Sequence, residues 1–247
     1  MKFAVITDIH ANREALEAVL AHARAHQVQR HAFLGDLVGY GADPGWVVDC
    51  VSEHVARGDL VVQGNHDAAA VSGASMTMRA ELMQVIAWTR AQLTPVQIDF
   101  LAALPLVQET GEVLFVHANA YQPSAWGYIE GRAEAARSMR ATRRRITFCG
   151  HMHEPRLYHL TTHGNAGEFV PPPGTVIPLL APRRWLVIPG AAGQPRDGDP
   201  AASYAVFDDE RAELTCWRVP YDHERASAKV SAAGLPEALA TRLIDGH

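Results

Sequence analysis

The chain begins with a short apolar stretch, Lys2-Phe3-Ala4-Val5-Ile6, followed directly by Thr7-Asp8-Ile9-His10. An apolar run of this length predicts a buried strand, and the spacing of apolar residues over 12–28 predicts a helix after it. A strand that leads into a helix is the repeating unit of α/β folds. The polar residues Asp8 and His10 would then lie at the carboxyl end of the first strand.

The same arrangement recurs four more times along the first 153 residues. Apolar segments predict strands at 31–34, 59–63, 113–116 and 146–149. These segments lead into Gly35-Asp36, Gly64-Asn65-His66-Asp67, His117 and Gly150-His151-Met152-His153. Ligands of open α/β sheets bind outside the carboxyl ends of the strands. We therefore expect the side chains at all five strand ends to converge on one place.

The rest of the pattern predicts further helices and a strand-rich second half. We expect helices at 44–55, 74–92 and 132–143, one beginning at Thr94, and two short ones at 222–230 and 236–244. Frequent prolines after His153 predict short extended pieces, and 204–207 with 214–219 predict a hairpin. We expect one α/β domain over 1–247, with a Pro/Gly-rich insertion near 161–182.

The composition limits the classes of function. With 247 residues, the chain is long enough for one sizeable core. Its 22 basic and 27 acidic residues give a net charge of −5, which argues against long nucleic acids and anionic membranes as partners. Apolar runs are too short for a membrane span. Three scattered cysteines, Cys50, Cys149 and Cys216, favour a reducing cytoplasm.

The side chains at the predicted strand ends offer oxygen and nitrogen ligands and no thiolate. Seven are candidate metal ligands: Asp8, His10, Asp36, Asn65, His117, His151 and His153. Such a set suits Mn²⁺, Fe, Zn²⁺ or Ni²⁺, and its size favours two adjacent ions that share one carboxylate. Two divalent ions outweigh two carboxylates in charge, which suits a phosphate ester in its transition state. A metal-bridging hydroxide would attack the phosphorus in line.

In order and spacing, these motifs resemble the calcineurin-like metallophosphoesterase superfamily over residues 8–153. The resemblance implies a four-layer α/β/β/α sandwich of two mixed sheets flanked by helices. It also implies the roles of the ligands: a first ion on Asp8, His10, Asp36 and His153, with Asp36 bridging to a second ion on Asn65, His117 and His151. His66 would be catalytic, because it would stabilise or protonate the leaving oxygen, a contribution of about 10²–10⁴ in rate. Asp67 is expected to orient His66.

A narrower resemblance is to the bacterial YfcE-like and diadenosine tetraphosphatase-like branch. It rests on 35–41 and on 193–200, which contains Arg196, a candidate phosphate contact or else a salt-bridge residue. Asn12 would contact substrate or cap the first helix. The branch commonly has Gly where this chain has Ala11. We expect a small phosphodiester or nucleotide-type substrate, with Mn²⁺ supporting activity.

Other functions stay open at this point. They are a phosphomonoesterase or protein serine/threonine phosphatase, a nuclease acting on short oligonucleotides, and a non-catalytic interaction module that kept the fold. Gly39-Tyr40 argues against the protein phosphatase, because eukaryotic phosphatases have Asp-Arg there. We expect a cytoplasmic protein that binds neither long nucleic acid nor membrane, and the pattern predicts no oligomeric state. Five of the 13 histidines have proposed roles, and the other eight are expected to be ordinary surface residues.

Overall fold

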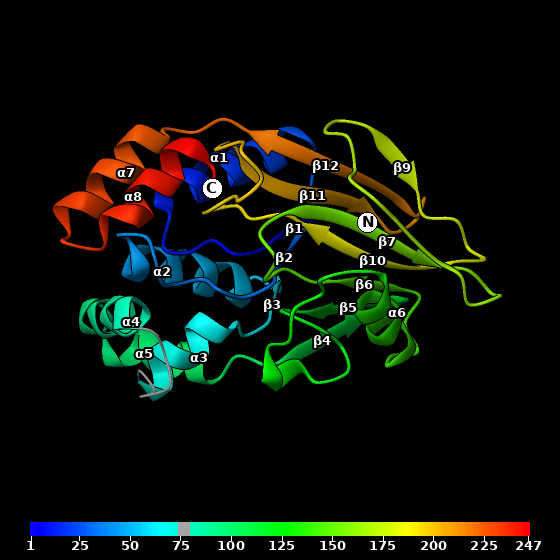
Figure 1. Cartoon of the computed structure of the whole chain (residues 1–247), viewed down its shortest axis with the longest axis horizontal. Coiled ribbons are helices and arrows are strands. Elements are labelled where there is room, and N and C mark those ends of the chain that lie inside the picture. Colours follow the sequence, from blue (N-terminus) through cyan, green and yellow to red (C-terminus); the bar gives the residue numbers. More distant parts are fainter. Residues whose placement is uncertain (74–79) are drawn as a thin grey trace.

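In the computed structural model, which describes residues 1–73 and 80–247, the strands form two six-stranded sheets (Figure 1). The first sheet has the order β3 (Leu60–Val61), β2 (Arg30–Phe33), β1 (Lys2–Ile6), β11 (Ala202–Asp208), β12 (Glu213–Val219), β9 (Val176–Pro178). The second has the order β4 (Val107–Thr110), β5 (Val113–Val116), β6 (Ile146–Phe148), β10 (Arg184–Pro189), β7 (Pro155–Leu160), β8 (Ala166–Phe169). Both sheets are mixed, as expected.

Parallel pairing brings the strand ends together. Strands β1, β2 and β3 are parallel neighbours, so the loops that follow them leave the same edge of the first sheet. Strands β5, β6 and β10 are parallel neighbours in the second sheet. The motifs after β1, β2, β3, β5 and β6 therefore belong to the carboxyl edges of two parallel sets, which the face-to-face packing of the sheets places side by side.

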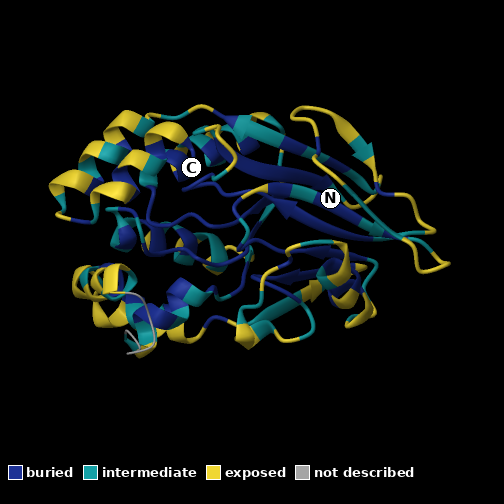
Figure 2. Cartoon of the chain, viewed as in Figure 1, coloured by how far each residue is buried: buried dark blue, intermediate teal, exposed yellow. Residues whose placement is uncertain are grey.

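An apolar layer joins the two sheets. Phe3 of β1 and Phe115 of β5 lie 6.2 Å apart between ring centroids, and Phe148 of β6 lies 5.4 Å from Phe207 of β11. Most strand residues are buried, and exposed residues gather on the helices and turns (Figure 2). This layer stabilises the packing of the two sheets, because burial of apolar surface is worth about 25 cal/mol per Å².

Helices cover both outer faces, which completes the predicted four-layer α/β/β/α sandwich. The helices are α1 (Arg13–Ala25), α2 (Pro44–Ala56), α3 (Asn65–Ser72), α4 (Ala80–Gln92), α5 (Pro95–Ala102), α6 (Arg132–Arg140), α7 (His223–Ala232) and α8 (Glu237–Asp245). Leu16 and Val19 of α1 pack with Ile6 of the first sheet. Met139 of α6 packs with Val116 of the second. No helix in the described part of the chain has the length and apolarity that crossing a membrane requires.

Most predicted elements are present, with shifted ends. Thr94 caps α5 in a capping box with Gln97, as its sequence predicts. The helix predicted over 74–92 is observed as α4, and residues 74–79 lie outside the described residues. The segment 161–182 contains β8 and β9, which pair at the edges of different sheets.

A half-buried hydrogen-bonded cluster ties α2 to the amino end of β2, away from the motifs. Asp59 Oδ2 accepts hydrogen bonds from Nδ1 of His31 and of His54, at 2.9 and 2.7 Å. Asp59 Oδ1 accepts one from the backbone N–H of His31, at 2.7 Å. The side chains of His31 and His54 are only 16% and 14% exposed, so the prediction that they are ordinary surface residues is wrong.

We expect Asp59→Asn to destabilise the fold by about 2 kcal/mol, because hydrogen bonds to a charged group are lost. Partial burial would raise the pKa of Asp59, but hydrogen bonds from His31 and His54 hold it well below its usual value. A depressed folded pKa gives stability that is present above the unfolded value, near ~4, and is lost as the pH falls below it. Denaturant unfolding at pH 7 and pH 3 should show a difference that shrinks in acid. An equal effect from Asp99→Asn, an exposed carboxylate on α5, would contradict this.

Candidate metal centre

The loops after β1, β2 and β6 carry a strained backbone. Five non-glycine residues of the motifs have positive φ angles: Asp8 (53°), His10 (49°), Asp36 (50°), His151 (69°) and His153 (63°). Ala11, which stands where the related branch commonly has Gly, has φ 51°. Such angles are uncommon for non-glycine residues and cluster at functional sites, where surrounding structure enforces them. The same turns aim the side chains of both Asp8 and His10 at one point.

Two glycines of the motifs let the loops approach closely. A Cβ at Gly64 would overlap the backbone and carboxylate of Asp36, and a Cβ at Gly150 would overlap Thr7 and the carboxylate of Asp8. In both cases a carboxylate of another loop occupies the space that a side chain at the glycine would need. The glycines in Gly64-Asn65-His66-Asp67 and Gly150-His151-Met152-His153 are thus required by the geometry of the site.

A first group of candidate ligands joins the loops after β1 and β6. Nε2 of His10 lies 3.1 Å from Nε2 of His153. Asp8 Oδ1 lies 3.4 Å from Nε2 of His153 and 3.9 Å from Nε2 of His10. All three side chains are at most 3% exposed, so they face one another rather than solvent.

A second group joins the loops after β2, β3, β5 and β6. Nε2 of His117 lies 3.4 Å from Asp36 Oδ2, 3.1 Å from Asn65 Oδ1 and 3.2 Å from Nδ1 of His151. Asp36 Oδ2 also lies 3.7 Å from Nε2 of His10, a member of the first group. The structure thus brings all seven predicted ligands together, with Asp36 between the two groups.

The hydrogen-bond partners of the histidines fit metal ligands. Nδ1–H of His10, His117 and His153 donates to the carbonyl oxygens of Val38, Leu34 and Gln194, at 3.2, 2.7 and 2.7 Å. Such a bond fixes the tautomer and leaves the Nε2 lone pair free, the arrangement found around metal-ligating histidines. Lone pairs of His10 and His153 and oxygens of Asp8 and Asp36 converge, which is repulsive without a cation between them. The donor set therefore fits divalent transition metals.

The pKa values follow from burial and from the two carboxylates. Burial lowers the pKa of His10 and of His153 well below the usual value, so both are neutral and able to bind metal. Burial alone would lower the pKa of His117, but Asp36 and Asp8 raise it to about 9. Metal binding near Asp36 would displace that proton, because only neutral imidazole is a ligand.

His66 lies at the rim of both groups, at the start of α3. Its backbone N–H donates to Asp36 Oδ1 at 2.8 Å, and its ring meets that of His10 edge-on at 5.0 Å between centroids. It is close enough to His10 and Asp36 to count geometrically as a ligand too. Its Nδ1 is buried without a hydrogen-bond partner in the described residues and faces Gly39, which leaves Nε2 available to a substrate.

Asp67 does not orient His66. Its Oδ1 accepts hydrogen bonds from the backbone N–H groups of Leu37 and Val38, at 2.9 and 3.2 Å, and its Oδ2 accepts from Gly64 at 2.9 Å. Burial and the nearby Asp36 raise the pKa of Asp67 to about 7. Asp67 thus anchors the loop that follows Asp36, and the role predicted for it from the sequence is wrong.

Arg196 is a cation beside the candidate ligands. Its Nη2 donates to Gln194 Oε1 at 2.9 Å, and its guanidinium lies 5.7 Å from the ring centroid of Tyr40. Within 1–73 and 80–247, no carboxylate pairs with Arg196, and its buried Nε has no hydrogen-bond partner. The alternative of a structural salt bridge thus finds no support, and an anion at the site would satisfy this cation.

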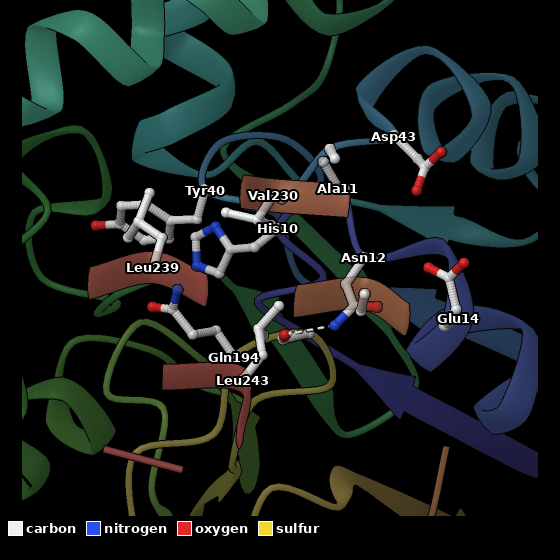
Figure 3. Close-up of a pocket in the computed structure, with 14 residues that line it drawn as sticks. His10, Ala11, Asn12, Glu14, Tyr40, Asp43, Gln194, Val230, Leu239 and Leu243 are labelled. Atoms are coloured by element: carbon white, nitrogen blue, oxygen red, sulfur yellow. Dashed lines mark hydrogen bonds between the residues drawn. The ribbon is translucent and has the colours of Figure 1, made fainter. Parts of the chain in front are cut away.

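Asn12 is occupied within the protein. Its Oδ1 accepts from the backbone N–H of Ala15 at 3.1 Å and so caps α1, and its Nδ2 donates to Gly193 O at 2.8 Å (Figure 3) and Tyr221 Oη at 3.1 Å. The helix cap is thus present, and a substrate contact by Asn12 stays a prediction.

Two hollows flank His10 and His66. Behind His10, residues of α7 and α8 close a cavity of about 10 Å³, room for one water at most (Figure 3). A separate cleft of about 340 Å³ is lined by Asn65, His66 and His151. Trp126 and Tyr128 also line this cleft. Neither could be predicted as a site residue from the sequence, because only the conformation of their loop sets them apart.

The two packed sheets and the buried His/Asp cluster at their strand ends are the fold and the donor set of a metal-binding α/β/β/α sandwich protein. Residues 1–212 match the calcineurin-like phosphoesterase superfamily domain, and the chain belongs to this superfamily of metal-dependent hydrolases acting on phosphoesters. The motifs that carried the resemblance all fall within the matched residues. Helices α7 and α8 lie beyond them.

The chain is also similar to individual proteins and solved structures. The uncharacterized protein MJ0912 of Methanocaldococcus jannaschii is 33% identical over 250 residues, which cover 99% of this chain and 98% of that protein. The crystal structure of a metallophosphoesterase from Sphaerobacter thermophilus is 36% identical, covers 100% of both chains and has a TM-score of 0.88. A crystal structure described as a putative diadenosine tetraphosphatase has a TM-score of 0.51 and 16% identity, covering 87% of this chain and 93% of that one. That last similarity shows a shared fold.

Proposed function

We propose that this chain is a binuclear metal-dependent phosphoesterase that hydrolyses a small phosphodiester or nucleotide-type compound. The observation that carries the proposal is the position of Asp36, whose Oδ2 lies 3.4 Å from Nε2 of His117 and 3.7 Å from Nε2 of His10. One carboxylate between two groups of imidazoles suits two ions that share a ligand. When bound, such ions supply positive charge to a phosphate and lower the pKa of water.

The chain's own residues would hold and orient the ester. Arg196 would bind a phosphate oxygen, since it is a cation without a carboxylate partner in the described residues. His66 would donate from Nε2 to the leaving oxygen. The cleft beside His66 would hold the organic part of the substrate. A net charge of −5 does not exclude an anionic substrate, because the positive charge of the site would come from metal ions and Arg196.

We expect the purified chain to hydrolyse bis(p-nitrophenyl) phosphate faster than p-nitrophenyl phosphate, with Mn²⁺ more effective than Ni²⁺ or Zn²⁺. Removal of metal with a chelator should abolish turnover, and added Mn²⁺ should restore it. The reason is that hydrolysis by the proposed route depends on the metal ions that the candidate ligands would hold. The measurement is release of p-nitrophenolate, with bound metal counted by elemental analysis. Turnover of neither ester with any of the three metals would count against the proposal. Faster turnover of the monoester would favour the phosphomonoesterase alternative.

A non-catalytic interaction module is the competing function from another class. The presence of all seven candidate ligands and of His66 in one cluster favours catalysis, because a protein that only binds a partner would not require these side chains. Binding of a partner that persists after removal of metal, together with no turnover, would favour the module. The cytoplasmic location is proposed on the three free cysteines, which suit a reducing compartment.

A further inference from the structure

Two aromatic side chains of one loop pack against the second group of candidate ligands. Trp126 follows the short 3-10 helix η1 (Pro123–Ala125), and its ring lies edge-on to His117 at 5.9 Å between centroids. Tyr128 stacks on His151 at 4.3 Å with 13° between the ring planes. One face of Tyr128 is thus covered, while the residue as a whole is 51% exposed. A large ring held open to solvent on one face is a surface suited to stacking.

The loop that carries Trp126 and Tyr128 has an energetically unfavourable backbone conformation. Trp126 has φ 55° and ψ 32°, a left-handed backbone that is unfavourable for a bulky side chain. Asn119, which is fully buried two residues after His117, fixes the loop: its Nδ2 donates to Gly127 O at 2.8 Å, and its Oδ1 accepts from Gln122 N–H at 2.9 Å. Strain of this kind persists where the surrounding structure enforces it, commonly at ligand sites.

The cleft of about 340 Å³ beside these rings has both polar and apolar residues in its lining. Asn65, His66 and His151 are among the polar residues, and Trp126, Tyr128 and Ile86 of α4 are among the large aromatic and apolar ones. That volume lies at the lower end of the range of ligand pockets, enough for one ring system. A phosphate at the candidate ligands would thus direct one substituent between the aromatic rings and α4.

We propose that this cleft is a binding subsite for a planar aromatic or heteroaromatic substituent of the phosphoester. The subsite rests on the proposed function, since it places the phosphate at the candidate metal ligands. Trp126 and Tyr128 stack on the substituent, and His66, where the cleft meets the ligands, faces its ester oxygen. A saturated ring of equal size gains apolar burial in the cleft but lacks the flat face that stacking requires.

Binding of non-hydrolysable phosphonates tests the subsite without turnover. The probes are phenyl-, cyclohexyl- and methylphosphonate, titrated by calorimetry into the chain loaded with Mn²⁺. We expect phenylphosphonate to bind about tenfold more tightly than methylphosphonate and several-fold more tightly than cyclohexylphosphonate, because stacking on aromatic side chains contributes on this scale. The flat and the saturated ring differ little in size, so their ratio isolates stacking from burial.

Variants locate the effect. Trp126→Leu and Tyr128→Leu keep apolar side chains and should each reduce the preference for phenyl over cyclohexyl severalfold. The preference is a ratio measured within one variant, so a change of phosphate affinity common to both compounds cancels. Tyr128→Phe keeps the ring and serves as the matched control. Equal binding of the phenyl and cyclohexyl compounds by the wild-type chain, or an unaltered preference in both leucine variants, overturns the subsite while methylphosphonate binding upholds the phosphate site. Binding of none of the three compounds overturns the subsite and the proposed function together.

Discussion

Replacing Asp36 with Asn is expected to reduce phosphodiester hydrolysis by at least about 10³-fold and to lower the bound metal from two ions per chain to one or none. The Oδ1 of Asp36 accepts the backbone N–H of His66, so the oxygen of an asparagine would keep that place. Its amide nitrogen would then replace Oδ2, which lies within 3.7 Å of Nε2 of both His10 and His117. The variant would therefore place an N–H donor at the position where the site needs a carboxylate oxygen that both metal ions can share.

Asp67→Asn is the matched control for this variant. Asp67 is a buried carboxylate in the same group of loops, but its oxygens accept hydrogen bonds from backbone N–H groups and do not face the candidate ligands. We expect it to lower the free energy of unfolding and to leave the metal content at the wild-type value. Metal content by elemental analysis, initial rates and thermal unfolding separate the two variants. If the Asp36 variant keeps two ions and a rate near that of the wild type, Asp36 does not bridge.

The strand ends could be predicted because their signal is local. Each apolar run is long enough to specify a buried strand, and the polar motif follows it directly, so the parallel pairing of β1 with β2 brings Asp8 and Asp36 together. The packing of the second sheet against the first then adds His117, which follows β5. Helix α3 (Asn65–Ser72) was missed since Gly64-Asn65-His66-Asp67 looks like a loop. Its first turn is stabilised by the Asp67 carboxylate, which accepts the backbone N–H of Gly64.

Other features depend on contacts between distant residues and leave no local signal. His31 and Asp59 are 28 residues apart, and only the parallel pairing of β2 with β3 makes their hydrogen bonds possible. Tyr128 reaches His151 through the packing of the loop beside β6, so its stacking could not be inferred from spacing. Arg196 was a candidate from its motif alone, and its lack of a carboxylate partner among the described residues became visible only in the fold.

His66→Gln is expected to lower kcat by about 10²–10⁴-fold for esters with poor leaving groups while leaving both metal ions bound. His66 is not among the seven predicted ligands, and its Nδ1 faces Gly39, so Nε2 is the nitrogen that can reach a leaving oxygen. A glutamine fills similar space but transfers no proton. With p-nitrophenolate as the leaving group, the loss should be much smaller, because that anion departs without protonation.

Two measurements distinguish this role of His66 from a structural one. A series of aryl diesters with leaving groups of rising pKa should show a steeper fall of kcat in His66→Gln than in the wild type. Burial lowers the pKa of His66, so its charged form grows as the pH falls, and the ratio of wild-type to variant rates should rise from pH 8 to pH 6. A merely positioning imidazole would change every ester by the same factor at every pH. Parallel leaving-group plots would therefore assign His66 to structure, and another group would have to assist the departing oxygen.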